Sequence, residues 1–331
     1  MAQEIADVSD AAKRLLATDE LFDRFADAIR DKAPRIAVMC GRGSSGHVGV
    51  YLRYLFEARL GMLVSASAPS VITAYQRAPD MRDALFLVVS QSGHSPDLIA
   101  ATQSARSLGA LTIAIVNDEN SPVAAASDLV VPILAGPERA VAATKTVILS
   151  MLAGARLVAA LARDRALSDA VQRVPGRLAE AQEVDWSFWG QTLVRAPAAF
   201  VAARGYGFGP AREIALKLSE TLRIPALGYS SAELRHGPRA AINSKTPVLL
   251  LRQQDEAGAT VDELVRELIN RGEPVFVAGG KSGLPWIGDD HPILDPVVML
   301  VPAYRAIEEA ARKRGFDPDN PPHLTKVTRT L

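Results

Sequence analysis

Two serine-rich segments of this sequence could bind a phosphate group. Gly41–Gly46 and Ser90–Asp97 each follow a short apolar run. In the second segment Ser95 fits the N-cap position of a helix and Pro96 fits its first turn. A helix N-terminus offers unpaired N–H groups and a partial positive charge, which suit an anion. We therefore expect a phosphate to be bound by the hydroxyls and the amide of Ser44, Ser45, Ser90, Gln91, Ser92 and Ser95, with an ordinary capped turn as the alternative.

A third segment, Ala211–Leu222, carries charges that could transfer a proton. Glu213, Lys217 and Glu220 are spaced by four and three residues, so they share one face of a predicted helix. The alternative is an ion pair on an exposed helix surface.

Two further residues could act as acid, base or nucleophile. His236 lies in a loop before Gly237-Pro238, and Lys326 lies in the uncharged stretch 320–328. Taken alone, each is more typical of a surface residue. The other histidines have no Cys or His partner at the spacing of metal ligands, so we predict no metal site.

The elements that position these residues are predicted from short β-branched runs that alternate with longer amphipathic segments. Such alternation indicates βαβ units and a parallel sheet covered by helices. The carboxyl edge of such a sheet would then hold both serine turns. The buried strands that we predict are Arg35–Cys40, Ala84–Ser90, Leu111–Asn117 and Leu129–Pro132.

The pattern recurs once along the chain. Gly43 matches Gly205 at a spacing of 162 residues, and Gly109 matches Gly272 at 163. We therefore predict two tandem doubly wound parallel-sheet domains (flavodoxin-like) that arose by internal duplication. The predicted parts are an N-terminal helical segment 1–34, a first domain 35–170, a linker 171–190 and a second domain 191–331.

The two copies differ at the second turn. Where the first copy has Ser90–Ser95, the second has Arg252–Ala257, which lacks serine. If an anion binds, we expect it to bind to the first copy.

Composition narrows the class of protein. The 37 Lys and Arg balance the 37 Asp and Glu, and no basic stripe is present, which disfavours a nucleic-acid partner. The longest uninterrupted apolar runs are too short to span a membrane, and from the acidic residues near the start we expect no signal peptide. A single cysteine, Cys40, fits a reducing compartment, so we expect a cytoplasmic protein.

Taken together, these motifs resemble those of the sugar isomerase (SIS) domain family, and in particular the double-SIS isomerase part of glucosamine-6-phosphate synthase and its stand-alone relatives. The resemblance runs from about residue 35 onward. The segments that carry it are Gly43-Ser44-Ser45, Ser90-Gln91-Ser92-Gly93 with Ser95, Ala215–Glu220, Glu233–Pro238 and Leu324–Thr328.

The resemblance implies roles for these residues. The serine turns would bind the phosphate of a sugar 6-phosphate, and Glu220 would move a proton between C1 and C2. Lys217 would stabilise negative charge, and Glu213 would lie in the substrate site. His236 would open the sugar ring from the partner subunit of a homodimer. Lys326 would engage the open-chain carbonyl, and no cofactor would be needed.

Two departures bear on the substrate. The synthase has a glutaminase domain with a cysteine directly after the initiator Met, whereas position 2 here is Ala2. Ala143 also replaces a serine that lies near the sugar in the synthase. We therefore predict a deaminase/isomerase that converts glucosamine 6-phosphate to fructose 6-phosphate and ammonia. The alternatives are a fructosamine-6-phosphate deglycase, a synthase-like isomerase supplied with ammonia by another protein, and a non-catalytic sugar-phosphate sensor.

Overall fold

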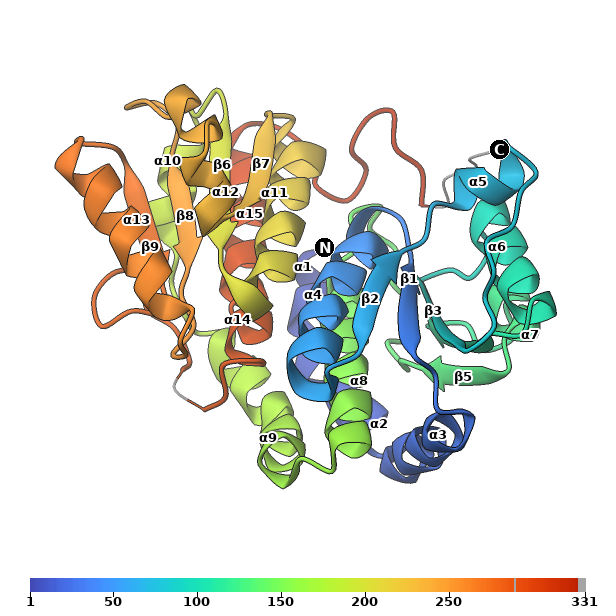
Figure 1. Ribbon diagram of the computed structural model, residues 1–331. Helices are drawn as coiled ribbons and strands as arrows, with labels where there is room; N and C mark the ends of the chain where they lie inside the picture. The colour runs from blue at the N-terminus through green and yellow to red at the C-terminus, as the bar shows by residue number, and fades with distance from the viewer. Residues whose placement is uncertain (289, 327–331) are drawn as a thin grey trace. The chain divides into compact units, whose positions relative to one another are not determined.

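The computed structural model describes residues 1–288 and 290–326, and within them the chain forms two compact units (Figure 1). The first-copy unit contains Asp10–Glu138, Lys145–Gln172, Thr325 and Lys326. The second-copy unit contains Met1–Ser9, Arg139–Thr144 and Arg173–Leu324. Each is named after the copy of the repeat whose sheet it contains. The predicted domain boundaries stay a prediction.

The first-copy unit is built on a sheet whose described strands are all parallel, in the order β2-β1-β3-β4-β5. The four predicted strands are confirmed to within one residue at each end. They form because their residues are apolar and lie between helices that cover both faces; all seven residues of β3 are buried. Strand β2 was not predicted, because it is short, lies at the sheet edge and buries only Val64. The strands are β1 (Ile36–Cys40), β2 (Leu63–Ala66), β3 (Ala84–Ser90), β4 (Leu111–Val116) and β5 (Leu129–Pro132).

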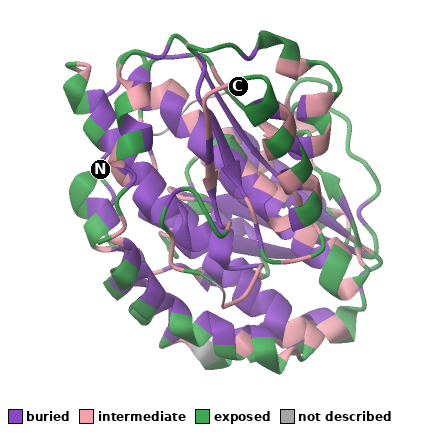
Figure 2. Ribbon diagram, turned by 90° about the vertical axis from the view of Figure 1, so that its left-hand side faces the viewer, coloured by how far each residue is buried: buried purple, intermediate pink, exposed green. Residues whose placement is uncertain are grey.

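Helices cover this sheet. For the described chain as a whole, Figure 2 shows buried residues along the strands and exposed residues on the outward faces of the helices. The N-terminal segment is helical, as predicted. The helices from the N-terminus to the end of the first copy are α1 (Ala2–Ala6), α2 (Val8–Leu16), α3 (Asp19–Lys32), α4 (Gly43–Leu60), α5 (Pro69–Thr73), α6 (Pro96–Ser107), α7 (Pro122–Ala126) and α8 (Lys145–Ala162).

The second-copy unit repeats the arrangement with one strand fewer, in the order β7-β6-β8-β9 for its described strands, again all parallel. These are β6 (Ala199–Ala203), β7 (Ala226–Ser230), β8 (Val248–Leu251) and β9 (Val275–Ala278). Its helical elements are α9 (Arg165–Ala181, which begins in the first-copy unit), α10 (Ser187–Leu193), η1 (Gly205–Gly207), α11 (Phe208–Leu222), α12 (Ser231–Arg235), η2 (Pro238–Ala241), α13 (Gly258–Asn270), α14 (Asp295–Val298) and α15 (Leu300–Lys313).

The predicted duplication is confirmed by strand order and by backbone conformation. Both sheets begin with the same crossover, so that β1, β2, β3 and β4 correspond to β6, β7, β8 and β9. The matched glycines share left-handed backbones: φ is 50° at Gly43 and 56° at Gly205, and 92° at Gly109 and 74° at Gly272. Only glycine adopts this conformation at little cost, so the turns that these residues form are the same in both copies.

One helix in the described part of the chain is long and apolar enough to cross a membrane by length and composition. This helix is α8. Of its 18 residues, 83% are buried inside the protein, as in the core helix of a globular domain. No long uninterrupted apolar run in the sequence marks this helix. The expected cytoplasmic location stays a prediction.

Candidate functional site

The two serine turns leave the first-copy sheet at the same edge, as predicted. One turn follows β1 and the other follows β3, and these strands are paired side by side, with Cys40 opposite Val88. In the order β2-β1-β3, the chain reverses direction across the sheet between β1 and β3, which is where open α/β sheets bind ligands.

The side chains of these turns are accessible to a ligand. All of the predicted binding residues except Ser90 are half-buried; they are Ser44, Ser45, Gln91, Ser92 and Ser95. The buried Ser90 hydroxyl accepts a hydrogen bond from the Gly93 N–H at 3.1 Å. Ser95 is the N-cap of α6, as predicted, yet its hydroxyl makes no hydrogen bond with that helix. It can therefore turn toward a ligand instead.

The shape of the second turn is fixed by close packing. Gly93 has φ +67°, and a Cβ atom there would lie 2.0 Å from the Ser121 hydroxyl. The Ser92 hydroxyl accepts a hydrogen bond from the His94 N–H at 3.3 Å. A turn held in this way is preorganised, because no further ordering is needed when an anion binds.

An ion pair that the sequence analysis missed joins the two turns. Arg42, in the first turn, donates from Nε and Nη2 to Asp97 Oδ2, both at 2.9 Å. Asp97 lies in the first turn of α6 and is 1% exposed. Nothing in the spacing of the sequence indicated that Arg42 and Asp97 are partners.

The three charged residues that share one face of α11 lie mostly inside the protein rather than on its surface. Glu213 and Lys217 have fully buried side chains, and Glu220 is 22% exposed. Lys217 Nζ lies 3.4 Å from Glu213 Oε1 and also contacts Glu220 Oε2. The Tyr304 hydroxyl donates to Glu213 at 3.3 Å. The shared face is confirmed, and the alternative of a solvent-exposed ion pair is wrong.

This cluster keeps a positive charge inside the protein. Burial by itself lowers the pKa of the Lys217 ammonium, but the charges of Glu213 and Glu220 outweigh burial, so that its pKa is raised. Buried charges of this kind are costly and are concentrated at functional sites. Glu220 is the partly exposed member of the cluster, so its carboxylate is accessible to a ligand.

His236 lies at the surface of the second-copy unit. It is exposed at the C-terminal end of α12, a helix that is capped by the Ser230 hydroxyl. It lines a cavity of about 430 Å³ together with Ala232, Arg235, Arg239 and Glu267. Glu267 forms ion pairs with both arginines. An exposed histidine beside such a cavity is free to meet a partner molecule.

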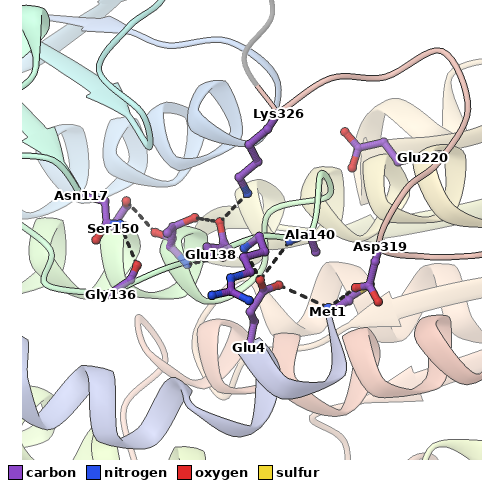
Figure 3. Close-up of polar contacts among 12 residues, drawn as sticks. Met1, Glu4, Asn117, Gly136, Glu138, Ala140, Ser150, Glu220, Asp319 and Lys326 are labelled. Carbon is purple, nitrogen blue, oxygen red and sulfur yellow. Dashed lines mark hydrogen bonds and ion pairs between the residues drawn. The ribbon is translucent and has the colours of Figure 1, made fainter.

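Lys326 is held by a buried carboxylate that the sequence analysis did not find. Its ammonium lies 3.1 Å from Glu138 Oε2, and the Glu138 side chain is fully buried (Figure 3). Glu138 also accepts hydrogen bonds from the N–H and the hydroxyl of Thr146, at 3.1 and 2.7 Å. Thr146 lies in the first turn of α8. The motif residues 327 and 328 lie outside the described residues.

Two further sequence predictions concern Ala143 and metal binding. Ala143 is half-buried and lies in the second-copy unit, directly before the buried Thr144. Among residues 1–288 and 290–326, no group of three or more His, Cys, Asp or Glu side chains could hold a metal ion.

The SIS domain profile matches residues 29–160 and 192–288, which is more than half of the chain. The chain belongs to the SIS domain family. A crystal structure from Silicibacter pomeroyi DSS-3, provisionally named a phosphosugar isomerase, is 37% identical and superposes with a TM-score of 0.91. That match covers 96% of this chain and 98% of the other.

Two further matches are less similar in sequence. Glucosamine-6-phosphate deaminase from Thermotoga maritima has the same fold, with a TM-score of 0.81, 24% identity and 99% of each chain covered. The isomerizing glutamine–fructose-6-phosphate aminotransferase of Zymomonas mobilis is 30% identical over 321 residues, covering 86% of this chain and 50% of the relative. This chain therefore spans about half the length of the curated relatives it matches.

Proposed function

We propose that this SIS protein is a phosphosugar isomerase that deaminates glucosamine 6-phosphate. One water molecule is consumed, and the products are fructose 6-phosphate and ammonia. The observation that carries the proposal is the α11 cluster, in which a partly exposed carboxylate lies beside a lysine that stays charged while fully buried. Proton transfer between neighbouring carbons needs such a carboxylate and a fixed positive charge for the enediol-type intermediate.

Each candidate residue has a role in this proposal. The phosphate binds to the serine turns, and Glu220 carries the proton between C2 and C1. Lys217 stabilises the negative charge that develops on oxygen. Lys326 engages the open-chain C1–C2 region, and Glu138 is the carboxylate that holds its ammonium.

We further propose that the enzyme is a homodimer and that His236 opens the sugar ring of the neighbouring subunit. The exposure of His236 beside a cavity supports this role. Sedimentation of the active enzyme should show a dimer, and an active monomer would contradict the proposal.

The reaction is tested by incubating the protein with glucosamine 6-phosphate in the presence of EDTA. Ammonia is measured with glutamate dehydrogenase, and fructose 6-phosphate with a phosphoglucose isomerase-coupled assay. We expect the two products in equal amounts. Turnover of fructosamine 6-phosphates with release of an amino acid, and none of glucosamine 6-phosphate, would instead identify a deglycase. Binding of sugar phosphates without turnover would identify a sensor.

A further inference from the structure

The second copy lacks a helix that the first copy has. In the first copy, residues 117–128 connect β4 to β5 and include α7, which packs against α6 and β4 (Figure 1). In the second copy, only residues 279–283 connect β9 to Leu284, which bridges to Ala278 in the place of a fifth strand. These five described residues form no helix. The position beside α13 and β9 that corresponds to α7 is therefore left without one.

Residues next to this position are less buried than their counterparts. The helices α6 and α13 are equivalent in the two copies, and their buried residues match at a spacing of 163 positions. The matching buried residues are Leu98 and Val261, Ala101 and Leu264, and Ala105 and Leu268. The same spacing pairs three fully buried residues of the first copy with three half-buried valines of the second. These pairs are Thr102 with Val265, Thr112 with Val275, and Ala114 with Val277.

A cavity of about 580 Å³ occupies the place of the missing helix. It is lined by α13, β9, the loop Gly280–Gly283 and Phe188 of α10. The Phe188 side chain is 72% exposed and packs edge-on against Phe276, with ring centroids 5.6 Å apart. Ile269, also in the lining, is 58% exposed where the first copy has the charged Arg106. The volume and the aromatic lining fit a small-molecule site.

The net charge of the side chains that line the cavity indicates which kind of ligand fits it. Its charged lining residues are Arg252, Asp262 and Lys281. Arg252 and Asp262 neutralise each other through two hydrogen bonds, at 2.7 and 2.9 Å. Lys281 makes no hydrogen bond or ion pair with any residue in the described part of the chain, which leaves one unpaired positive charge at the carboxyl end of β9. Ligands of open α/β sheets bind at that edge.

We propose that this cavity binds a small molecule that carries a planar apolar ring and an anionic group. The ring packs against Phe188 and Phe276, and the anion pairs with Lys281. The site uses none of the residues assigned to the sugar-phosphate reaction, so it is a second ligand site of the protein.

The test uses the full-length protein and 8-anilinonaphthalene-1-sulfonate, a fluorescent aromatic anion. We expect one saturable site on the wild-type protein. Lys281→Glu and Phe188→Ala each weaken its binding at least about fivefold, because one reverses the charge and the other removes the ring. Lys245→Glu is the matched control, since Lys245 is an exposed lysine of the same unit and does not line the cavity. Phe188 is too exposed for its removal to disturb folding, and circular dichroism checks this.

Three outcomes would overturn the proposal. Equal binding by Lys281→Glu and Lys245→Glu would show that the cavity lysine plays no part. Loss of binding in Ser92→Ala/Ser95→Ala would place the probe on the serine turns. A fall in sedimentation mass on Phe188→Ala would make this face an interface between copies. Because the readout is binding, it does not depend on whether glucosamine 6-phosphate is the substrate. Competition by 1-naphthyl phosphate, but not by inorganic phosphate, would confirm that the ring is required.

Discussion

The helices that follow the first strand of each copy, α4 and α11, have the same course but different buried residues. Both end on a left-handed residue, Gly61 in α4 and Arg223 in α11, 162 positions apart. At that spacing Glu213 and Lys217 correspond to Tyr51 and Leu55, and all four side chains are fully buried. The same two helix positions therefore hold an uncharged pair in one copy and an ion pair in the other.

The difference separates what the fold needs from what function needs. Since α4 has uncharged residues at these positions, the fold does not require charges there, and burying charges costs free energy. At the serine turns it is the first copy that has the candidate functional residues. The second copy has Arg252–Ala257 in place of Ser90–Ser95 and buries Gln253 there. This contrast favours a division in which the first copy binds the phosphate and the second carries out the proton transfer.

The largest expected effect comes from the carboxylate that is specific to the second copy. Glu220→Gln should lower kcat for glucosamine 6-phosphate by about 10²- to 10⁴-fold, the contribution of a positioned general base. Binding of the sugar phosphate, measured by calorimetry, should change less than about threefold. Glu309→Gln, at an exposed position of α15, is the control. Near-normal turnover by Glu220→Gln would show that the base is another residue.

Breaking the buried ion pair between Glu213 and Lys217 of α11 should have a large effect on the free energy of unfolding. Lys217→Leu leaves Glu213 buried without its cation and should lower the free energy of unfolding by about 3–5 kcal/mol. The double variant Glu213→Leu/Lys217→Leu should regain most of this loss, because it buries no charge at these positions, as in α4. Trp186, Trp189 and Trp286 all lie in the second-copy unit, so tryptophan fluorescence during urea unfolding reports on that unit. A double variant no more stable than Lys217→Leu would mean that the two helices do not tolerate the same residues.

A smaller effect is expected at the serine turns. Ser92→Ala or Ser95→Ala should raise KM by about 10- to 100-fold, since a hydrogen bond to a charged group contributes about 1.5–3 kcal/mol. The value of kcat should change less than about threefold. Gln254 is the counterpart of Ser92 in the second copy, so Gln254→Ala is the matched control and should leave both constants unchanged. An equal rise in KM for Gln254→Ala would contradict the assignment of phosphate binding to the first copy alone.

The sequence predicted those parts of this comparison that depend on local pattern. Apolar runs such as Ala84–Ser90 predict buried strands, and Gly43 and Gly205 mark equivalent turns, because each signal comes from a few adjacent residues. The burial of Lys217 could not be predicted from its spacing to Glu213 and Glu220, because an exposed ion pair on a helix has the same spacing. A comparison of the two copies along their helices would have indicated that Lys217 is buried, since the apolar Leu55 occupies the matching position of the first copy. The Lys326–Glu138 pair joins residues 188 positions apart, and no sequence signal indicates it.

The smallest effect is expected at Cys40, whose counterpart at the same spacing is Ala202. Both are buried in the first strand of their sheet, so Cys40→Ala should change the free energy of unfolding by no more than about 1 kcal/mol at pH 7.5. Burial raises the pKa of the Cys40 thiol from about 9 to about 12, so only the unfolded chain releases this proton at pH 9–12. Wild-type stability should therefore fall by about 1.4 kcal/mol per pH unit in that range relative to Cys40→Ala. Urea unfolding followed by circular dichroism at pH 7.5 and pH 10 measures this difference. If the two proteins lose stability in parallel, the native thiol ionises as readily as the unfolded one, and Cys40 is a candidate nucleophile that its alanine counterpart cannot replace.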